Sequence, residues 1–268
     1  MASVKLIATD LDGTLLDSTG EIPERNFKII KEAMAGGVAF TVCTGRMFRS
    51  AMRFAEQLGV KLPLICYNGA MLKRLDGEVI WHKPLDLGIA KELLSVFRER
   101  GVHVQSYVDD VVYVRSGGAE AYNEYSRTFG VTGEAVGDDL YNPQSPPTKL
   151  LGITGTDKEA ESLVPFLSGK FGDEIYVTRS NSNFVEVMNK DVNKAKGLAK
   201  LAGIMGIQMC DVMAVGDGEN DVEMVAMAGF GIAMDNGAEK IKKAAFRVAP
   251  TNDENGVSWA VERFALRA

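Results

Sequence analysis

The sequence predicts an α/β fold in which a parallel-sheet core is interrupted by a smaller α+β unit. Short buried strands alternate with amphipathic helices over residues 1–82 and again over 190–268, the order typical of a parallel sheet with crossover helices. Over 83–189 the predicted strands also pair as hairpins, which is typical of an α+β unit. We therefore predict one discontinuous core domain, 1–82 with 190–268, and one inserted domain, 83–189.

Length and composition agree with a soluble protein of one or two domains. The chain has 268 residues, more than the roughly 100 to 150 of a usual domain. Its formal net charge of -6 gives no reason to expect nucleic acid or an anionic membrane as a partner. No apolar run approaches the roughly 20 residues of a membrane span, and no signal peptide is apparent. We expect a cytoplasmic protein, and nothing in the sequence indicates its oligomeric state.

The first half of the core predicts strand, turn and helix in repeated order. The run that follows Val4 is short, apolar and β-branched, as in a strand buried on both faces. Pro23 and the double glycine at 36–37 fit the start and end of the next helix. The remaining elements expected here are a strand at 38–43, a helix ending near Gly59, a strand at 64–67 and a hairpin at 71–81 around Asp76-Gly77.

The same patterns of apolar residues predict the helices and strands of the inserted unit and of the second half of the core. In the insert we expect helices at 87–100, 120–129 and 158–171, and strands at 102–108, 111–115, 149–154, 175–178 and 184–188. After it we expect helices at 194–205 and 219–228, strands at 211–215, 230–233 and 246–248, and a terminal helix.

Four carboxylates are predicted at one edge of the core sheet. Asp10 and Asp12 follow the first strand, Asp217 follows a later one, and Asp221 lies on the next helical turn. Taken alone, Asp12 and the glycine after it could simply form a turn. However, ligands of open α/β sheets bind at the carboxyl ends of the strands. Clustered carboxylates repel one another unless a cation compensates, and oxygen ligands without His or Cys indicate Mg²⁺.

A phosphate site is predicted beside these acids. Thr44 and Gly45 lie where a strand gives way to a helix, so a hydroxyl and free N–H groups can face an anion. Lys194 opens another helix, where a cation is unfavourable without an anionic partner; Lys196 is an alternative. The only histidines, His82 and His103, lie outside these motifs, so catalysis by histidine is not expected.

Cysteines and methionines are expected to be structural. Cys43, Cys66 and Cys210 are odd in number and widely spaced, which favours buried, reduced thiols over disulfides or a zinc site. A second set, expected to pack in the core, comprises Met224, Met227 and Met234.

Four motifs in order resemble those of the haloacid-dehalogenase superfamily of phosphohydrolases. They are DLDGTLL (10–16), CTGR (43–46), VNKAKGL (192–198) and GDGEND (216–221). The insert between the second and third resembles the large α/β cap of the Cof-type subfamily, which includes sugar-phosphate phosphatases. The resemblance implies a Rossmann-like core with an inserted α+β cap that selects the substrate. One departure is Ala195, where family members often have glycine after the lysine.

The resemblance also implies roles for the site residues. Asp10 would be the nucleophile that forms an aspartyl-phosphate, and Asp12 the general acid and base. Mg²⁺ would be held by Asp10, the backbone carbonyl of Asp12, and Asp217, with Asp221 either binding the ion or supporting another ligand. The phosphoryl oxygens would be bound by Thr44, Gly45, Lys194 and Asn220. Weaker candidates are Arg46 and Asn68 at the pocket rim, and Tyr107, Asp109, Arg179, Asn181 and Asn183 at loop ends of the cap.

Several functions are compatible with these motifs. The first is a Mg²⁺-dependent phosphatase of small phosphorylated metabolites, with sugar phosphates ahead of flavin or pyridoxal phosphates. A phosphomutase of the same superfamily would use Asp10 and Asp12 but would return the phosphoryl group to its product. A non-catalytic metabolite-binding module is disfavoured because no acid of the set is missing.

Overall fold

The computed structural model describes residues 3–116, 126–127 and 130–266. The chain forms two compact units, one of residues 1–81 and 193–268 and one of residues 82–192. Each unit has its own hydrophobic core, and each is described separately below.

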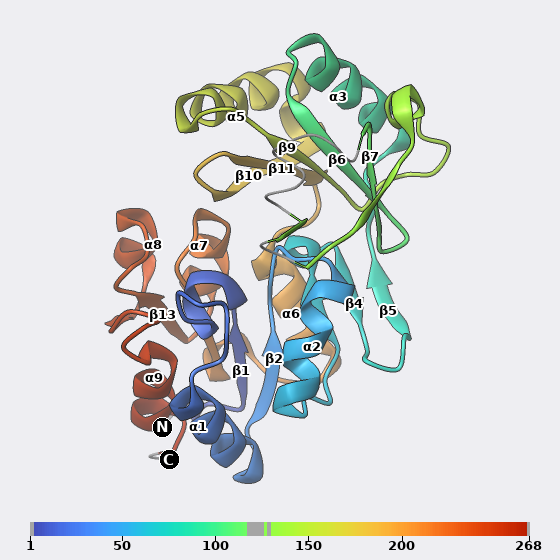
Figure 1. Cartoon of the computed structure of the whole chain (residues 1–268). Coiled ribbons are helices and arrows are strands. Elements are labelled where there is room, and N and C mark those ends of the chain that lie inside the picture. The colour runs from blue at the N-terminus through green and yellow to red at the C-terminus, as the bar shows by residue number, and fades with distance from the viewer. Residues whose placement is uncertain (1–2, 117–125, 128–129, 267–268) are drawn as a thin grey trace. The chain divides into compact units, whose positions relative to one another are not determined.

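The first unit is built on a five-stranded sheet in the order β14-β13-β12-β1-β2, in which all neighbours are parallel (Figure 1). Its strands are β1 (Leu6–Thr9), β2 (Ala39–Val42), β12 (Val212–Gly216), β13 (Phe230–Met234) and β14 (Arg247–Ala249). Every residue of β1 and β12 is buried. Apart from Thr9, the residues of these two strands are apolar or glycine, because both faces of a parallel sheet are covered.

Six α-helices of the described chain surround this sheet. They are α1 (Glu24–Ala35), α2 (Phe48–Leu58), α6 (Lys194–Ile204), α7 (Val222–Met227), α8 (Glu239–Ala244) and α9 (Gly256–Phe264). Leu6 and Ala8 of β1 share one core cluster with side chains of α6, α7 and α8. Helix α1 packs against α9 and β2. The alternation of strand and helix therefore gives the α/β core that the sequence predicts.

An antiparallel sheet of order β3-β4-β5 extends this core. Its strands are β3 (Leu64–Cys66), β4 (Met71–Lys73) and β5 (Val79–His82). The strand predicted at 64–67 is β3; its ladder is to β4, and one isolated parallel bridge, between Cys43 and Ile65, links it to the chain after β2. The chain turns back at Tyr67 and Asn68, both in the left-handed region, immediately after β3.

The second unit is a six-stranded sheet of order β10-β11-β9-β6-β7-β8. Its strands are β6 (His103–Val108), β7 (Val111–Val114), β8 (Gly133–Ala135), β9 (Lys149–Ile153), β10 (Ile175–Asn181) and β11 (Phe184–Asn189). All pairs are antiparallel except β7 with β8. Helices α3 (Leu87–Glu99) and α5 (Asp157–Phe171) pack on it around a core that includes Phe97 and Leu150.

Most predicted elements are present with bounds shifted by one to three residues. β8 was not predicted, and the helix expected at 219–228 is a 3₁₀ turn (Glu219–Asp221) followed by α7. The helix expected at 120–129 falls almost wholly outside the described residues. No helix within the described ranges has the length and apolar character needed to cross a membrane.

Two expectations about buried side chains were wrong. Cys43 and Cys66 are buried free thiols, but Cys210 is exposed because it lies in the 3₁₀ turn Met209–Asp211 that precedes β12. Met224 and Met234 are buried, whereas Met227, the last residue of α7, is 45% exposed. Residues at the ends of short helices can face solvent even where the helix as a whole is amphipathic.

Candidate active site

The end of β1 places Asp10 at the edge of the core sheet. Its backbone N–H donates to the carbonyl of Val215 on β12 at 2.9 Å, so parallel pairing continues one residue past the strand. The chain then makes a single turn over Leu11–Leu15, in which Gly13 has a φ of +74°. A Cβ at Gly13 would collide with the carboxylate of Asp217. Gly13 therefore allows the turn after β1 to approach the turn after β12.

The end of β12 positions two further acids. Asp221 Oδ2 accepts hydrogen bonds from the backbone N–H groups of Asp217 at 3.1 Å and Gly218 at 2.9 Å, which closes the turn. Thr14 donates its hydroxyl to Asp217 Oδ1 at 2.6 Å. A side chain at Gly216 would collide with that of Asp221. The Asp221 carboxylate is thus held within its own turn, whereas the Asp217 carboxylate is held by Thr14 from the turn after β1.

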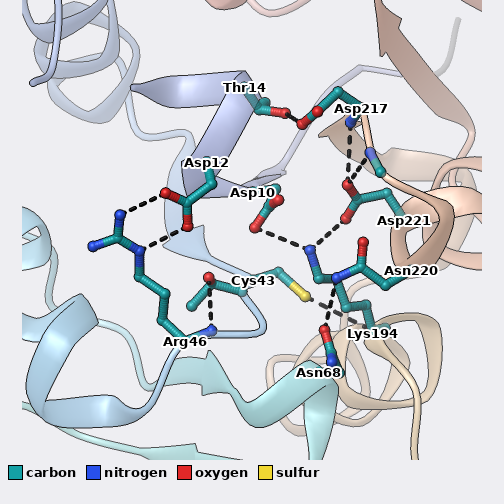
Figure 2. Close-up of polar contacts among 12 residues, drawn as sticks. Asp10, Asp12, Thr14, Cys43, Arg46, Asn68, Lys194, Asp217, Asn220 and Asp221 are labelled. Carbon is teal, nitrogen blue, oxygen red and sulfur yellow. Dashed lines mark hydrogen bonds and ion pairs between the residues drawn. The ribbon is translucent and has the colours of Figure 1, made fainter. Parts of the chain in front are cut away.

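Lys194 joins the two turns electrostatically. It is the first residue of α6, whose N-cap Asn193 accepts a hydrogen bond from the backbone of Lys196. The Lys194 ammonium lies 2.6 Å from Asp221 Oδ1 and 2.9 Å from Asp10 Oδ1, and the side chain is fully buried. Figure 2 shows this ammonium between the two carboxylates.

The pKa values of these groups reflect a deficit of positive charge. Burial, together with the neighbouring carboxylates, raises the pKa of Asp10 well above its ordinary value, although Lys194 opposes the shift. Burial and the charge of Asp221 raise the pKa of Asp217 to about 7. Burial alone would lower the pKa of Lys194, but Asp10 and Asp221 outweigh it and raise that pKa. One ammonium among three carboxylates leaves room for a cation.

Three carboxylates fit a divalent metal ion. One oxygen from each of Asp10, Asp217 and Asp221 lies within 4.8 Å of the others. Asp10 Oδ1 is buried, and the cation beside it is the Lys194 ammonium at 2.9 Å. Closely spaced carboxylate oxygens without nitrogen or sulfur donors are suited to a hard cation such as Mg²⁺. The side chain of Asp12 is not part of this group, so only its backbone carbonyl is available to such an ion.

The residues predicted to bind phosphate lie around the same acids. Thr44 follows β2 and is buried, and Gly45 after it is half-buried. Asn220 donates its side-chain amide to Asn68 Oδ1 at 2.9 Å, and the backbone N–H of Asn68 donates to the carbonyl of Thr44 at 3.0 Å. Asn68 was expected at the rim but is completely buried. It connects the Thr44 turn to the Asn220 turn.

Arg46 was also expected at the rim, and it too is buried. Its Nε donates to Asp12 Oδ2 at 2.7 Å, and its Nη2 donates to Asp12 Oδ1. Figure 2 shows the guanidinium facing the Asp12 carboxylate from the side opposite Asp10. Sequence reasoning missed this pair because residues 34 positions apart give no local signal of contact.

This geometry agrees with comparisons to known proteins. A family model described as haloacid dehalogenase-like hydrolase matches residues 7–261. The Bacillus subtilis 5-amino-6-(5-phospho-D-ribitylamino)uracil phosphatase YitU is 31% identical over 267 residues, which cover 97% of this chain and 98% of YitU. The chain belongs to the haloacid dehalogenase-like hydrolase family.

Further relatives support the assignment. The B. subtilis phosphatase YcsE, named for the same substrate as YitU, is 30% identical, covering 98% of this chain and 96% of YcsE. The crystal structure of TM0651 from Thermotoga maritima is 31% identical, with a TM-score of 0.83 and 99% of each chain covered. The resemblance to Cof-type members and the fold class are thus confirmed, and this haloacid dehalogenase-like hydrolase is a phosphatase.

The structure distinguishes the two candidate lysines of this hydrolase. Lys194 contacts Asp10 and Asp221, whereas the side chain of Lys196 is exposed. Ala195, the departure from the usual motif, is buried in the core. Lys194 still contacts Asp10 and Asp221 with alanine at that position.

The substrate-selecting candidates of this hydrolase all lie in the second unit, and they differ in exposure. Tyr107, expected at a loop end, is instead buried within β6 and donates its hydroxyl to Gln105 at 2.8 Å. Asp109 lies in the β6–β7 turn with a positive φ, and Asn183 lies in the turn between β10 and β11, where it donates to the carbonyl of Thr154. Arg179 and Asn181 lie on β10.

Proposed function

We propose that this phosphatase is Mg²⁺-dependent and hydrolyses small phosphorylated metabolites, sugar phosphates first among them, through an aspartyl-phosphate on Asp10. The observation that carries the proposal is the placement of Asp10. It is 6% exposed, lies at the carboxyl end of the inner strand β1, and shares its surroundings with Lys194, Asp217 and Asp221.

Two displacements at phosphorus account for the hydrolysis. A carboxylate oxygen of Asp10 forms a bond to phosphorus as the bond to the leaving oxygen breaks, and Asp12 gives that oxygen its proton. Water then attacks the phosphorus of the aspartyl-phosphate, Asp12 takes a proton from it, and Asp10 is released with inorganic phosphate. In both steps Asp12 must lie near Asp10 while its side chain stays outside the acid cluster. The contact with Arg46 allows this placement.

The surrounding residues hold the phosphoryl group during both steps. Lys194 provides a buried positive charge beside Asp10, while Thr44, Gly45 and Asn220 would supply hydroxyl, backbone and amide donors to the phosphoryl oxygens. Asp10, Asp217, the carbonyl of Asp12 and, directly or indirectly, Asp221 would hold Mg²⁺, which would offset the repulsion between the nucleophile and the phosphate.

The substrate class is inferred from the resemblance and the relatives. The names of YitU and YcsE place the phosphate of their substrate on a ribityl chain. A phosphate on a polyhydroxyl chain is common to that compound and to sugar phosphates, so we place both in the first group of substrates to test. The unit of residues 82–192 is proposed as the cap that distinguishes them, because the residues proposed to bind the phosphate all belong to the other unit.

Phosphate release from sugar, nucleotide and cofactor phosphates tests the proposal. The wild type is assayed with and without Mg²⁺ beside Asp10→Asn, and Asp235→Asn serves as a control because Asp235 is an exposed carboxylate in a surface ion pair. We expect metal-dependent release that is lost in Asp10→Asn and kept in Asp235→Asn. Full activity of Asp10→Asn would contradict the assignment of Asp10 as the nucleophile. Turnover that requires a bisphosphate and releases no inorganic phosphate would indicate a phosphomutase.

A further inference from the structure

The Arg46 guanidinium holds both oxygens of the Asp12 carboxylate. Nε and Nη2 donate in parallel to Oδ2 and Oδ1, so the two planar groups form a fork. A bidentate arginine fixes the plane of its carboxylate, which a point charge such as lysine cannot do. The contact therefore determines how Asp12 is oriented as well as how it is charged.

Arg46 is itself immobilised by the first unit. Its side chain is 7% exposed, Nη1 donates to Ser50 Oγ at 3.4 Å, and the guanidinium carbon lies 5.2 Å from the centre of the Phe54 ring. Its backbone N–H donates to Thr44 Oγ1, and its carbonyl accepts from the N–H of Tyr67. Helix α2 and the Thr44 turn thus present the guanidinium in one position.

Asp12 has much less support of its own. Its side chain is 47% exposed, and the residue lies in the turn Leu11–Leu15, immediately before the left-handed Gly13. Among the described residues, the group that contacts its carboxylate is the Arg46 guanidinium. A carboxylate has about four lone-pair sites, and the fork uses the two on one side. The remaining sites face away from Arg46, and Figure 2 shows Asp10 on that side.

We propose that Arg46 is the positioning residue for proton transfer by Asp12. The inference rests on the proposed function, in which Asp12 protonates the leaving oxygen. Arg46 keeps the carboxyl plane of Asp12 turned so that a proton carried on an oxygen site outside the fork faces that leaving oxygen, and it keeps Asp12 out of the acid cluster. When Asp12 gives up its proton, the resulting carboxylate already faces the guanidinium.

Dependence on the leaving group separates this role from substrate binding. An alkoxide needs a proton as it departs, whereas p-nitrophenolate does not. Single-turnover rates of the first chemical step are compared for glucose 6-phosphate, ribose 5-phosphate and p-nitrophenyl phosphate. General acid catalysis contributes typically 10² to 10⁴-fold. We expect Arg46→Ala to slow alkyl phosphates by about 10²-fold and p-nitrophenyl phosphate by a few-fold at most, with KM changing little.

A double-substitution cycle tests whether Arg46 acts through Asp12. In an Asp12→Asn background, Arg46→Ala is expected to cause little further loss, because the effects of residues that act as a unit are not additive. Arg46→Lys, which keeps the charge without the fork, is expected to behave like Arg46→Ala and serves if the alanine variant does not fold. Arg53→Ala is the control. Arg53 is exposed on α2, and its guanidinium contacts the same Phe54 ring that Arg46 contacts.

The outcomes separate this inference from the proposed function. If the wild type hydrolyses neither alkyl nor aryl phosphates, the proposed function fails. Suppose instead that the wild type is active. Arg46→Ala could then slow all substrates equally, raise KM alone, or reduce the rate as much in the Asp12→Asn background as in the wild type. Any of these results would mean that Arg46 binds substrate or supports the fold. The proposed positioning role would then be wrong, while the proposed phosphatase activity would be unaffected.

Discussion

Lys194 is the residue whose loss should disturb the site most broadly. It compensates two carboxylates, lies within 3 Å of both and is fully buried. Removing one partner of a buried ion pair typically costs 3–5 kcal/mol because the other charge is left uncompensated. We expect Lys194→Ala to lower the free energy of unfolding by about 3 kcal/mol or more without metal, and to abolish phosphate release. Urea unfolding and the phosphate assay measure these effects.

Lys196 supplies the matched control for that prediction. Its side chain is exposed, two residues further along the same helix. Surface substitutions usually change stability by less than about 0.5 kcal/mol, so Lys196→Ala should unfold like the wild type and keep its activity. If Lys196→Ala were the inactive variant and Lys194→Ala active, the assignment of the phosphate-binding lysine would be reversed.

The acids of the site should make stability depend on pH when no metal is bound. The pKa of Asp217 is raised from 3.8 to about 7, chiefly by burial and then by Asp221. Between these pH values the folded protein retains a proton that the unfolded chain has lost, so stability falls as pH rises from about 4 to 7 and levels off above. The raised pKa of Asp10 acts in the same direction.

Bound Mg²⁺ should oppose that fall, since the ion requires ionised oxygens and its binding stabilises the folded state. Thermal unfolding in EDTA and in Mg²⁺ at pH 5, 6, 7 and 8 is the measurement. We expect the stabilisation by Mg²⁺ to grow with pH up to about 7. Asp217→Asn should unfold with a shallower pH dependence in EDTA. An equal Mg²⁺ effect at all four pH values would contradict the raised pKa values.

At the scale of elements, adjacent strands of the second unit bury an ion pair within their sheet. Lys149 of β9 lies 2.6 Å from Glu186 of β11, and both side chains are at most 3% exposed. The ammonium also lies 4.8 Å from the centre of the Tyr107 ring on β6. We expect Lys149→Met to destabilise this unit by about 3–5 kcal/mol, as followed by urea unfolding with hydrogen exchange in β9 and β11.

The double variant Lys149→Met with Glu186→Leu distinguishes a missing partner from a missing side chain. Replacing a whole buried pair by apolar residues of similar size is often neutral or stabilising. The double variant should therefore recover most of the stability that Lys149→Met loses. If it is as unstable as the single variant, the strands need the pair itself, for example through the contact with Tyr107.

The sequence predicts those parts of the molecule whose structure is encoded by residues close together in the chain. The strand that ends at Asp10, and the turn from Gly216 to Asp221, are encoded by apolar runs followed by acids and glycines. β8 is three residues of ordinary polarity (GEA), so its pairing with β7 could not be read from periodicity. The sequence already favours Lys194 over Lys196, but the contacts of Lys194 with Asp10 and Asp221, and the fork from Arg46 to Asp12, join distant segments and required the tertiary structure.

At the scale of the whole molecule, the chain divides into two units with separate cores. The chain passes from one unit to the other near residues 81–82 and 192–193. The predicted metal ligands, Asp10, Asp217 and Asp221, all belong to the first unit. The sequence contains two tryptophans, Trp81 and Trp259, and both also lie in the first unit. Tryptophan fluorescence therefore reports on the unit that would bind the metal.

This division predicts where the stabilisation by Mg²⁺ should appear. A ligand that binds only the folded form stabilises the unit that it contacts by mass action. Mg²⁺ should thus raise the midpoint of the fluorescence-detected urea transition and slow hydrogen exchange in β1 and β12. Strands β6, β9 and β11 should exchange as they do in EDTA. Asp217→Asn should abolish the shift. Equal protection of β9 and β11 by Mg²⁺ would show that the two units unfold together, in spite of their separate cores.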